Sequence, residues 1–167
     1  WGNFSATISD LHDDLDLPPG TGDVCLTLAQ TLPCTGAVIV CTPQKVAQDD
    51  AIRAARMFTQ LEIDVLGVVE NMSYFIGDDG KEYDIFGRGG AEMMAQRMGL
   101  PFLGRVPINM ALRANADEGK PAKNFEAAAA GGEALPAALE SLVTTLEGQV
   151  ALAQVRRGKS KPSLSIS

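Results

Sequence analysis

The 167-residue sequence has little of what several common kinds of functional site require. Its single histidine, His12, has no second histidine with which to share a metal ion. Its three cysteines, Cys25, Cys34 and Cys41, form neither a Cys-x-x-Cys pair nor an even-numbered disulfide framework. We therefore expect reduced, mostly buried thiols, and we assign neither His12 nor any cysteine as a metal ligand.

Basic charge and long apolar runs are also scarce. The chain carries 14 lysines and arginines against 21 aspartates and glutamates, a formal net charge of −7. Such a balance argues against a surface that neutralises nucleic-acid phosphates. No apolar run reaches the roughly 18 residues that span a bilayer, and the N-terminus lacks a basic region followed by an apolar one. We expect a cytoplasmic protein with no nucleic-acid or membrane partner.

The length of the chain fits one domain, and its 46% hydrophobic content is enough for a core of ordinary size. Because the first residue is Trp1 rather than methionine, we expect a processed chain or a piece of a longer one. Residues 1–153 are predicted to belong to the domain. Residues 154–167 contain basic but no acidic side chains and are predicted to form a disordered tail.

Short β-branched apolar runs alternate with helical patterns along the domain. Residues 36–41 and 65–69 are typical of strands buried on both faces of a parallel sheet. Residues 46–61 place apolar side chains at helical spacing, so the three segments predict a βαβ unit. The pattern continues with a helix over 89–98, a strand over 101–106 and a last helix over 133–153. The predicted fold class is α/β, a mostly parallel sheet flanked by helices.

Residues Asp16–Asp23, with the sequence DLPPGTGD, begin with an acidic residue that is followed by a turn rich in proline and glycine. A carboxylate at the end of a strand can hold Mg²⁺ or its water. Gly20 and Gly22 would let backbone N–H groups approach a phosphate without a Cβ in the way. The same residues also fit an ordinary turn that caps a helix beginning near Asp23.

Ligand sites in open parallel sheets lie outside the carboxyl ends of the strands. Four loops of this sequence would meet there: 16–23, 42–44, 70–73 and 106–109. Asn71 offers both a donor and an acceptor, which suits an adenine edge, and Pro107 supplies a stiff apolar surface for a base. Each loop alone is also a common turn. Together, in this order, they favour a nucleotide site.

Five stretches match one known family: DLPPGTGD at 16–23, LTLAQ at 26–30, TPQ at 42–44, ENMSYF at 70–75 and YDIFGRGGA at 83–91. In combination they closely resemble the Mrp/ApbC iron–sulfur cluster carrier ATPases. These belong to the deviant-Walker P-loop NTPases, together with the MinD and ParA proteins. The resemblance covers roughly residues 16–120.

The resemblance implies a P-loop NTPase-like fold and a homodimeric ATPase that uses ATP and Mg²⁺, binds a bridging [4Fe–4S] cluster and passes it to apo iron–sulfur proteins. Asp16 looks like the Walker B carboxylate that holds Mg²⁺, and Gly20 like the switch residue near the γ-phosphate. Asn71 looks like the adenine-reading residue, Pro107 like the wall of the base pocket, and Gln44 falls in a nucleotide-binding loop.

Two features upstream depart from the family pattern. No Gly-x-x-x-x-Gly-Lys-[Ser/Thr] loop occurs, because the Gly-Lys-Ser at 158–160 has Ala153 where the first glycine would stand, so nothing in this chain cradles the α- and β-phosphates. We expect this chain to be a C-terminal portion that lacks the P-loop half and hydrolyses no ATP by itself. The segment Ser5–Leu15 also places acidic residues where a buried strand needs aliphatic ones. We therefore expect no well-packed central strand there, and a poorly anchored Asp16.

A third departure concerns residues 76–81, which occupy the place of the family's Cys-x-x-Cys pair. Their sequence, IGDDGK, predicts a tight hairpin turn without a thiol. We therefore expect no iron–sulfur ligands in this chain and no [4Fe–4S] binding by the usual route. Asp78 and Asp79 could contact a cation, but adjacent acidic residues in such a turn are usually solvated.

Three functions remain open on the sequence, which favours the first. This is an ATP-binding iron–sulfur cluster carrier, of which the chain is one portion. The second is a non-catalytic fragment or interaction module of the same fold that binds no nucleotide. The third is a positioning ATPase of the ParA or MinD type. The motif at 83–91 and the lack of an amphipathic membrane-targeting terminus count against it.

Overall fold

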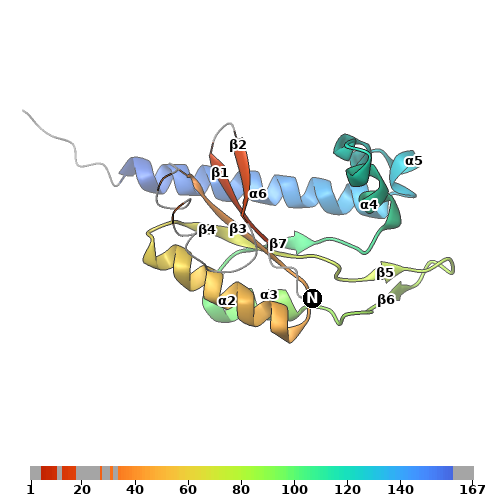
Figure 1. The fold of residues 1–167 in the computed structure, drawn as a ribbon, viewed down its shortest axis with the longest axis horizontal. Coiled ribbons are helices and arrows are strands. Elements are labelled where there is room, and N and C mark those ends of the chain that lie inside the picture. Colours follow the sequence, from red (N-terminus) through yellow and green to blue (C-terminus); the bar gives the residue numbers. More distant parts are fainter. Residues whose placement is uncertain (1–4, 11–12, 18–26, 28–30, 32–33, 160–167) are drawn as a thin grey trace, which may run out of the picture.

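A five-stranded sheet in the order β2-β1-β3-β4-β7 organises the protein (Figure 1). The computed structural model describes residues 5–10, 13–17, 27, 31 and 34–159. The strands of the sheet are β1 (Ser5–Asp10), β2 (Asp13–Leu17), β3 (Gly36–Cys41), β4 (Val65–Glu70) and β7 (Phe102–Arg105). The three strands predicted from apolar runs are therefore confirmed.

The sheet is mostly parallel, as predicted. Strand β4 pairs in parallel with β3 on one side and with β7 on the other. Strand β1 is antiparallel to both of its neighbours, β2 and β3. It follows that β2 runs in the same direction as β3, β4 and β7, so these four strands end at the same edge of the sheet.

The prediction that Ser5–Leu15 forms no well-packed central strand is wrong for the backbone. Residues 5–9 pair with 36–40 of β3, and residues 6–10 pair with 13–17 of β2. The prediction assumed one continuous strand in which all the acidic residues would be central. Instead the segment folds back on itself, and Asp13, Asp14 and Asp16 lie on β2, an edge strand that pairs with β1 alone among the described strands.

Helices cover both faces of the sheet (Figure 1). On one face, α2 (Lys45–Gln60) and α3 (Gly90–Met98) form a core with alternate residues of β3. These are Ala37, Ile39 and Cys41, whereas Val38 belongs to the core on the opposite face. There the long helix α6 (Ala134–Lys159) supplies Leu135 and Ala153. Two-residue alternation along a strand thus serves two separate helical layers.

Helix α6 continues past Ala153, where the domain was predicted to end. The prediction of a disordered tail is therefore wrong for residues 154–159, and residues 160–167 lie outside the described part. The Arg157 guanidinium donates to the backbone oxygen of Cys34 at 2.6 Å, and its Nε lies 4.0 Å from Oδ2 of Asp64. None of the described helices has the length and apolar character needed to cross a membrane.

The remaining elements lie beyond the carboxyl ends of β4 and β7, at one end of the molecule (Figure 1). They are the hairpin strands β5 (Phe75–Ile76) and β6 (Glu82–Tyr83), helix α4 (Met110–Asp117), the 3₁₀ helix η1 (Pro121–Phe125) and helix α5 (Ala127–Ala130). The hairpin is the tight turn predicted at residues 76–81.

The contact of β4 with β7 leaves no space for a side chain at Gly67. A Cβ added there would lie 2.6 Å from Cγ of Leu103. We expect Gly67→Ala to lower the free energy of unfolding by about 1–3 kcal/mol, because an overpacked core must shift to admit a methyl group. Urea denaturation measures the change.

Gly148 is the matched control for this prediction. It lies on the exposed side of α6, where an added Cβ would meet no atom within 4 Å. Gly148→Ala should raise the free energy of unfolding by about 0.5–1 kcal/mol, because alanine favours helix more than glycine does. Equal stability of the two variants would contradict the packing of β4 against β7.

Candidate functional site

Backbone hydrogen bonds join the loop that follows β4 to the loop that follows β7. The Val106 N–H donates to the oxygen of Glu70 at 2.8 Å, and the Ser73 N–H donates to the oxygen of Val106 at 3.0 Å. Farther along, the Ile108 N–H donates to the oxygen of Tyr74 at 2.7 Å. The two strands thus remain paired beyond the sheet, and the loops predicted to carry a nucleotide site lie side by side.

Asn71 and Pro107, predicted separately from these two loops, line one pocket of about 360 Å³, called here the Asn71 pocket. Its walls are largely apolar and include Met72, Ile108 and Leu112. Arg113 is the charged residue among the lining side chains. A mostly apolar pocket of this size with a few polar groups is typical of a small-molecule site.

The side chain of Asn71 is oriented by its own loop. Its Oδ1 accepts a hydrogen bond from the Met72 N–H at 2.9 Å, and its backbone N–H donates to the oxygen of Cys41 at 2.9 Å. Among the described residues its Nδ2 has no partner, so these two N–H donors are free to bind a ligand. Met72 has a φ of 55°, a left-handed conformation that strains a residue other than glycine and often marks a functional site.

Glu70 lies next to Asn71 and could not be recognised as part of the site's framework from the sequence alone. It ends β4 and is fully buried, and its carboxylate accepts three hydrogen bonds. The donors are the Ser73 hydroxyl at 2.5 Å, the Gly89 N–H at 2.9 Å and the Ala91 N–H at 2.8 Å. The available signal was an acidic residue at the end of an otherwise apolar run, since a carboxylate at such a position must find partners.

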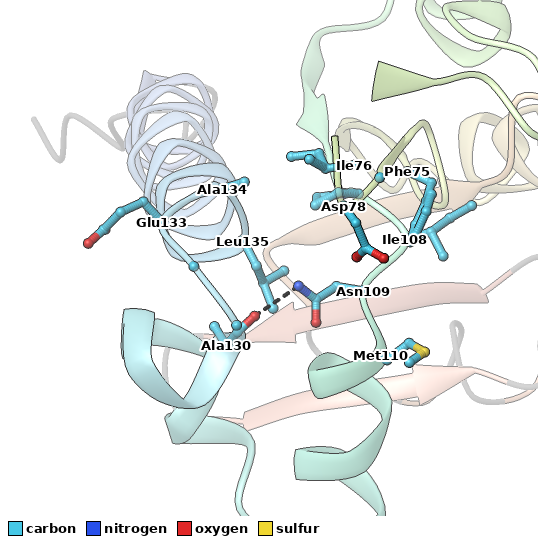
Figure 2. Close-up of a pocket in the computed structure, with 14 residues that line it drawn as sticks. Phe75, Ile76, Asp78, Ile108, Asn109, Met110, Ala130, Glu133, Ala134 and Leu135 are labelled. Carbon is cyan, nitrogen blue, oxygen red and sulfur yellow. Dashed lines mark hydrogen bonds between the residues drawn. The ribbon is translucent and has the colours of Figure 1, made fainter. Parts of the chain in front are cut away.

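A second cavity, of about 390 Å³, shares residues 107–110 with the Asn71 pocket (Figure 2). Its other walls come from the β5–β6 hairpin and the start of α6. The polar atoms of Asn109 are used within the fold. Its Nδ2 donates to the oxygen of Ala130 at 2.9 Å, drawn in Figure 2, and its Oδ1 accepts from the Leu112 N–H at 3.0 Å. Asn109 therefore caps α4 and is not available to read a ligand.

Gln44 does not join Asn71 and Pro107. It is exposed at the start of α2, where its backbone oxygen accepts from the Gln48 N–H at 3.1 Å, and it is not among the residues that line the Asn71 pocket. Gln48 in turn donates from its side chain to the oxygen of Pro43 at 2.6 Å. A nucleotide-binding role for Gln44 stays a prediction.

The two residues predicted to act at the phosphate, Asp16 and Gly20, also stay predictions. Asp16 is the residue before the last in β2, opposite Thr7 of β1. It therefore stands at the edge where β3, β4 and β7 end, with β1 between it and β3. Gly20 lies outside the described residues.

The hairpin turn that replaces the Cys-x-x-Cys pair is held by its own hydrogen bonds. The Gly77 N–H donates to the oxygen of Lys81 at 2.9 Å. The Lys81 N–H, and next the Tyr83 hydroxyl, donate to the Asp79 carboxylate and lower its pKa. Asp79 therefore serves the turn. Within the described ranges, no group of three or more His, Cys, Asp or Glu side chains is placed to hold a metal ion.

The described cysteines are poor candidates for cluster ligands. Cys34 and Cys41 are both buried, as predicted, and Cys25 lies outside the described residues. Burial and, to a lesser extent, the negative charge of Glu70 raise the pKa of the Cys41 thiol to about 12. Because iron is bound by the thiolate form, such a thiol is not ready to act as a ligand at neutral pH.

Comparisons with known proteins show which family the chain resembles. The chain is 47% identical over 155 residues to an iron–sulfur cluster carrier protein of Deinococcus radiodurans, covering 91% of this chain and 40% of that protein. It is 48% identical over 122 residues to the iron–sulfur cluster transfer protein NUBPL of Dictyostelium discoideum, covering 72% and 36%. The chain thus spans about 40% of the length of the first of these relatives.

A solved structure is also similar. It is a nucleotide-binding protein in complex with ADP from Archaeoglobus fulgidus, with a TM-score of 0.57 and 40% sequence identity. The similarity covers 63% of this chain and 44% of that one. A ParA family model, described as NUBPL iron-transfer P-loop NTPase, matches residues 14–147. The predicted resemblance is therefore confirmed: this chain belongs to the NUBPL-type iron-transfer P-loop NTPases of the ParA family.

Proposed function

We propose that this chain is part of an ATP-binding iron–sulfur cluster carrier and that its Asn71 pocket binds the adenine base. The observation that carries the proposal is the convergence of Asn71 and Pro107, from loops after two different strands, on one pocket of about 360 Å³. Relatives named as cluster carriers and a similar structure described as an ADP complex support it.

The pocket has the chemistry that an adenine base needs. The free Nδ2 of Asn71 can donate to a ring nitrogen of the base, and the hydrogen bond from Met72 keeps the amide in that orientation. Pro107 and the apolar side chains around it offer flat, dry surfaces to the faces of the ring. Asn71 would thus hydrogen-bond one edge of the base, and the apolar side chains would pack against its two faces.

The phosphates would lie nearer to β2. Asp16 would hold Mg²⁺ and Gly20 would sense the γ-phosphate, with Gln44 in the neighbouring loop, as the family resemblance implies. Because this chain contains no Gly-x-x-x-x-Gly-Lys-[Ser/Thr] loop, we propose that ATP hydrolysis is a property of the longer protein and that these 167 residues alone do not turn over ATP.

The remaining family properties are proposed for the whole protein. They are a homodimeric state, transfer of a [4Fe–4S] cluster to apo iron–sulfur proteins, and a cytoplasmic location. The turn at residues 76–81 carries no thiol, and the buried Cys34 and Cys41 do not replace it. Cluster ligands would therefore come from groups other than these.

Substitution of Asn71 tests the base pocket. We expect Asn71→Ala to weaken ADP binding about tenfold, because a lost hydrogen bond to a desolvated base costs a little over 1 kcal/mol. Asn71→Asp should weaken it at least as much, because it removes the free N–H donors. Isothermal titration calorimetry with ADP and GDP measures both affinity and base preference.

Gln60→Ala serves as the control, since Gln60 is exposed at the C-terminal end of α2 and does not line the pocket. It should bind ADP like the wild type. If Asn71→Ala binds ADP and GDP with wild-type affinities, Asn71 does not read the base and the interaction module without nucleotide becomes the better proposal.

Alkylation tests whether Cys41 is available to a cluster. With a pKa of about 12, about one Cys41 in ten thousand is ionised at pH 8. We expect iodoacetamide to leave Cys41 unmodified in the folded protein and to modify it in urea, as measured by peptide mass spectrometry. The iron content after reconstitution should also be the same in Cys41→Ser. Rapid native labelling of Cys41, or loss of iron in this variant, would show that the thiol is accessible.

A further inference from the structure

The carboxylate of Glu70 is a buried charged group that the proposed binding of a base does not by itself explain. Its side chain is completely inaccessible to solvent. Burying a carboxylate is unfavourable unless its oxygens are hydrogen-bonded. The three donors to Glu70 meet that requirement. Together with the nearby guanidinium of Arg105, they come from three segments of the chain.

The first segment is the loop of the Asn71 pocket. The Ser73 hydroxyl donates to Oε1 of Glu70 at 2.5 Å, and Ser73 is fully buried. Glu70 and Ser73 therefore close a short ring of chain around Asn71 and Met72, the two residues of this loop that line the pocket. This ring holds Met72 at its positive φ and fixes where the Asn71 amide points.

The second segment is the exit from the β5–β6 hairpin. Gly89 and Ala91 donate their backbone N–H groups to Oε1 and Oε2 of Glu70, at 2.9 and 2.8 Å. Gly89 is the N-cap residue of α3, and no side chain of its own segment caps that helix. Glu70 thus caps α3 from 19 residues away and anchors the chain where it leaves the hairpin.

The third segment is the end of β7, which leads to Pro107. Arg105 Nε lies 3.7 Å from Oε1 of Glu70, and the guanidinium also forms an ion pair with Glu92 of α3. Nε of Arg105 has no hydrogen-bond partner within the described part of the chain, so Glu92 holds one end of the guanidinium while Nε lies near Glu70 without a hydrogen bond to it. One carboxylate therefore contacts a residue next to each of the two loops that form the Asn71 pocket, and the segment between the hairpin and α3.

We propose that Glu70 is a positioning residue that couples the Asn71 pocket to the β5–β6 hairpin, so that binding a nucleotide base also restrains the hairpin. This inference rests on the proposed function, because it requires that the pocket bind a nucleotide. By the family resemblance, the hairpin occupies the place of the family's thiol pair, and it also lines the second cavity, which shares residues 107–110 with the Asn71 pocket. A helix cap with no further role would stabilise α3 but would leave base affinity unchanged.

Glu70→Gln tests the proposal, because glutamine keeps the shape of the side chain but turns one acceptor oxygen into a donor. ADP affinity is measured by calorimetry. Hydrogen exchange of residues 75–88 is measured with and without ADP. In the wild type, ADP should slow exchange in the hairpin. In Glu70→Gln we expect ADP to bind about tenfold more weakly, as for loss of a charge-assisted hydrogen bond, and to leave hairpin exchange unchanged.

Glu92→Gln is the matched control. Glu92 contacts Arg105 from α3 but accepts no hydrogen bond from Ser73, Gly89 or Ala91. The ADP affinity of the Glu92→Gln variant should therefore stay within about twofold of the wild-type value. Ser73→Ala provides a milder second variant in case Glu70→Gln does not fold. It removes one donor, and we expect about threefold weaker ADP binding with the hairpin response reduced.

The outcomes separate the two proposals. If the wild type binds ADP and the variants of Glu70 and Ser73 bind it equally well, the positioning role is overturned while the proposed function stands. The coupling is likewise overturned if ADP does not change the hydrogen-exchange rates of the hairpin in the wild type. All affinities are measured on the longer protein that contains this chain. If its wild type binds no ADP at all, the proposed function is overturned and this inference with it.

Discussion

Parallel pairing of β3, β4 and β7 is the constraint on which the candidate site depends. Parallel strands end at the same edge of a sheet, so three loops that are far apart in sequence must meet there. The hydrogen bonds among Glu70, Val106 and Ser73 extend this pairing by several residues beyond the last strands. The Asn71 pocket is therefore built on continuous sheet geometry rather than on loops free to move independently.

The same geometry explains why a charged residue is tolerated at the end of β4. Backbone N–H groups at the start of α3 and the hydroxyl of Ser73 converge on one point, and Glu70 satisfies them together. A neutral apolar residue there would leave these donors buried without acceptors, at a cost of about 1–3 kcal/mol for each. The network thus stabilises the fold and fixes the loop that carries Asn71. Stability and site geometry depend here on the same atoms.

Much of the fold could be predicted because its central strands are continuous runs of apolar residues. Residues 36–41 and 65–69 are continuous apolar runs, and the helix between them shows one clear stripe, so pattern alone predicts the unit. The segment before Asp16 could not be predicted in this way. Its acidic residues looked incompatible with any central strand, and only the pairing of β1 with β2 shows that most of them lie on the outermost strand. The extension of α6 was missed for a similar reason, because Arg157 is held by Cys34 and Asp64, which are distant in sequence.

The candidate site likewise contains residues that could be predicted from the sequence and one that could not. Asn71 and Pro107 follow directly from strands, so their convergence could be predicted from topology. Glu70 could not be placed, because its role depends on Gly89 and Ala91, whose N–H groups carry no signal in the sequence.

The position of α6 also has a consequence for how the protein is made. The core on one face of the sheet, which includes Val38, Leu66 and Leu103, is completed by residues of this last helix. Arg157 then reaches back across 123 residues of chain to Cys34. During synthesis the strands emerge from the ribosome well before the helix that covers them. That apolar face of the sheet therefore stays exposed to water and to chaperones until α6 has been synthesised.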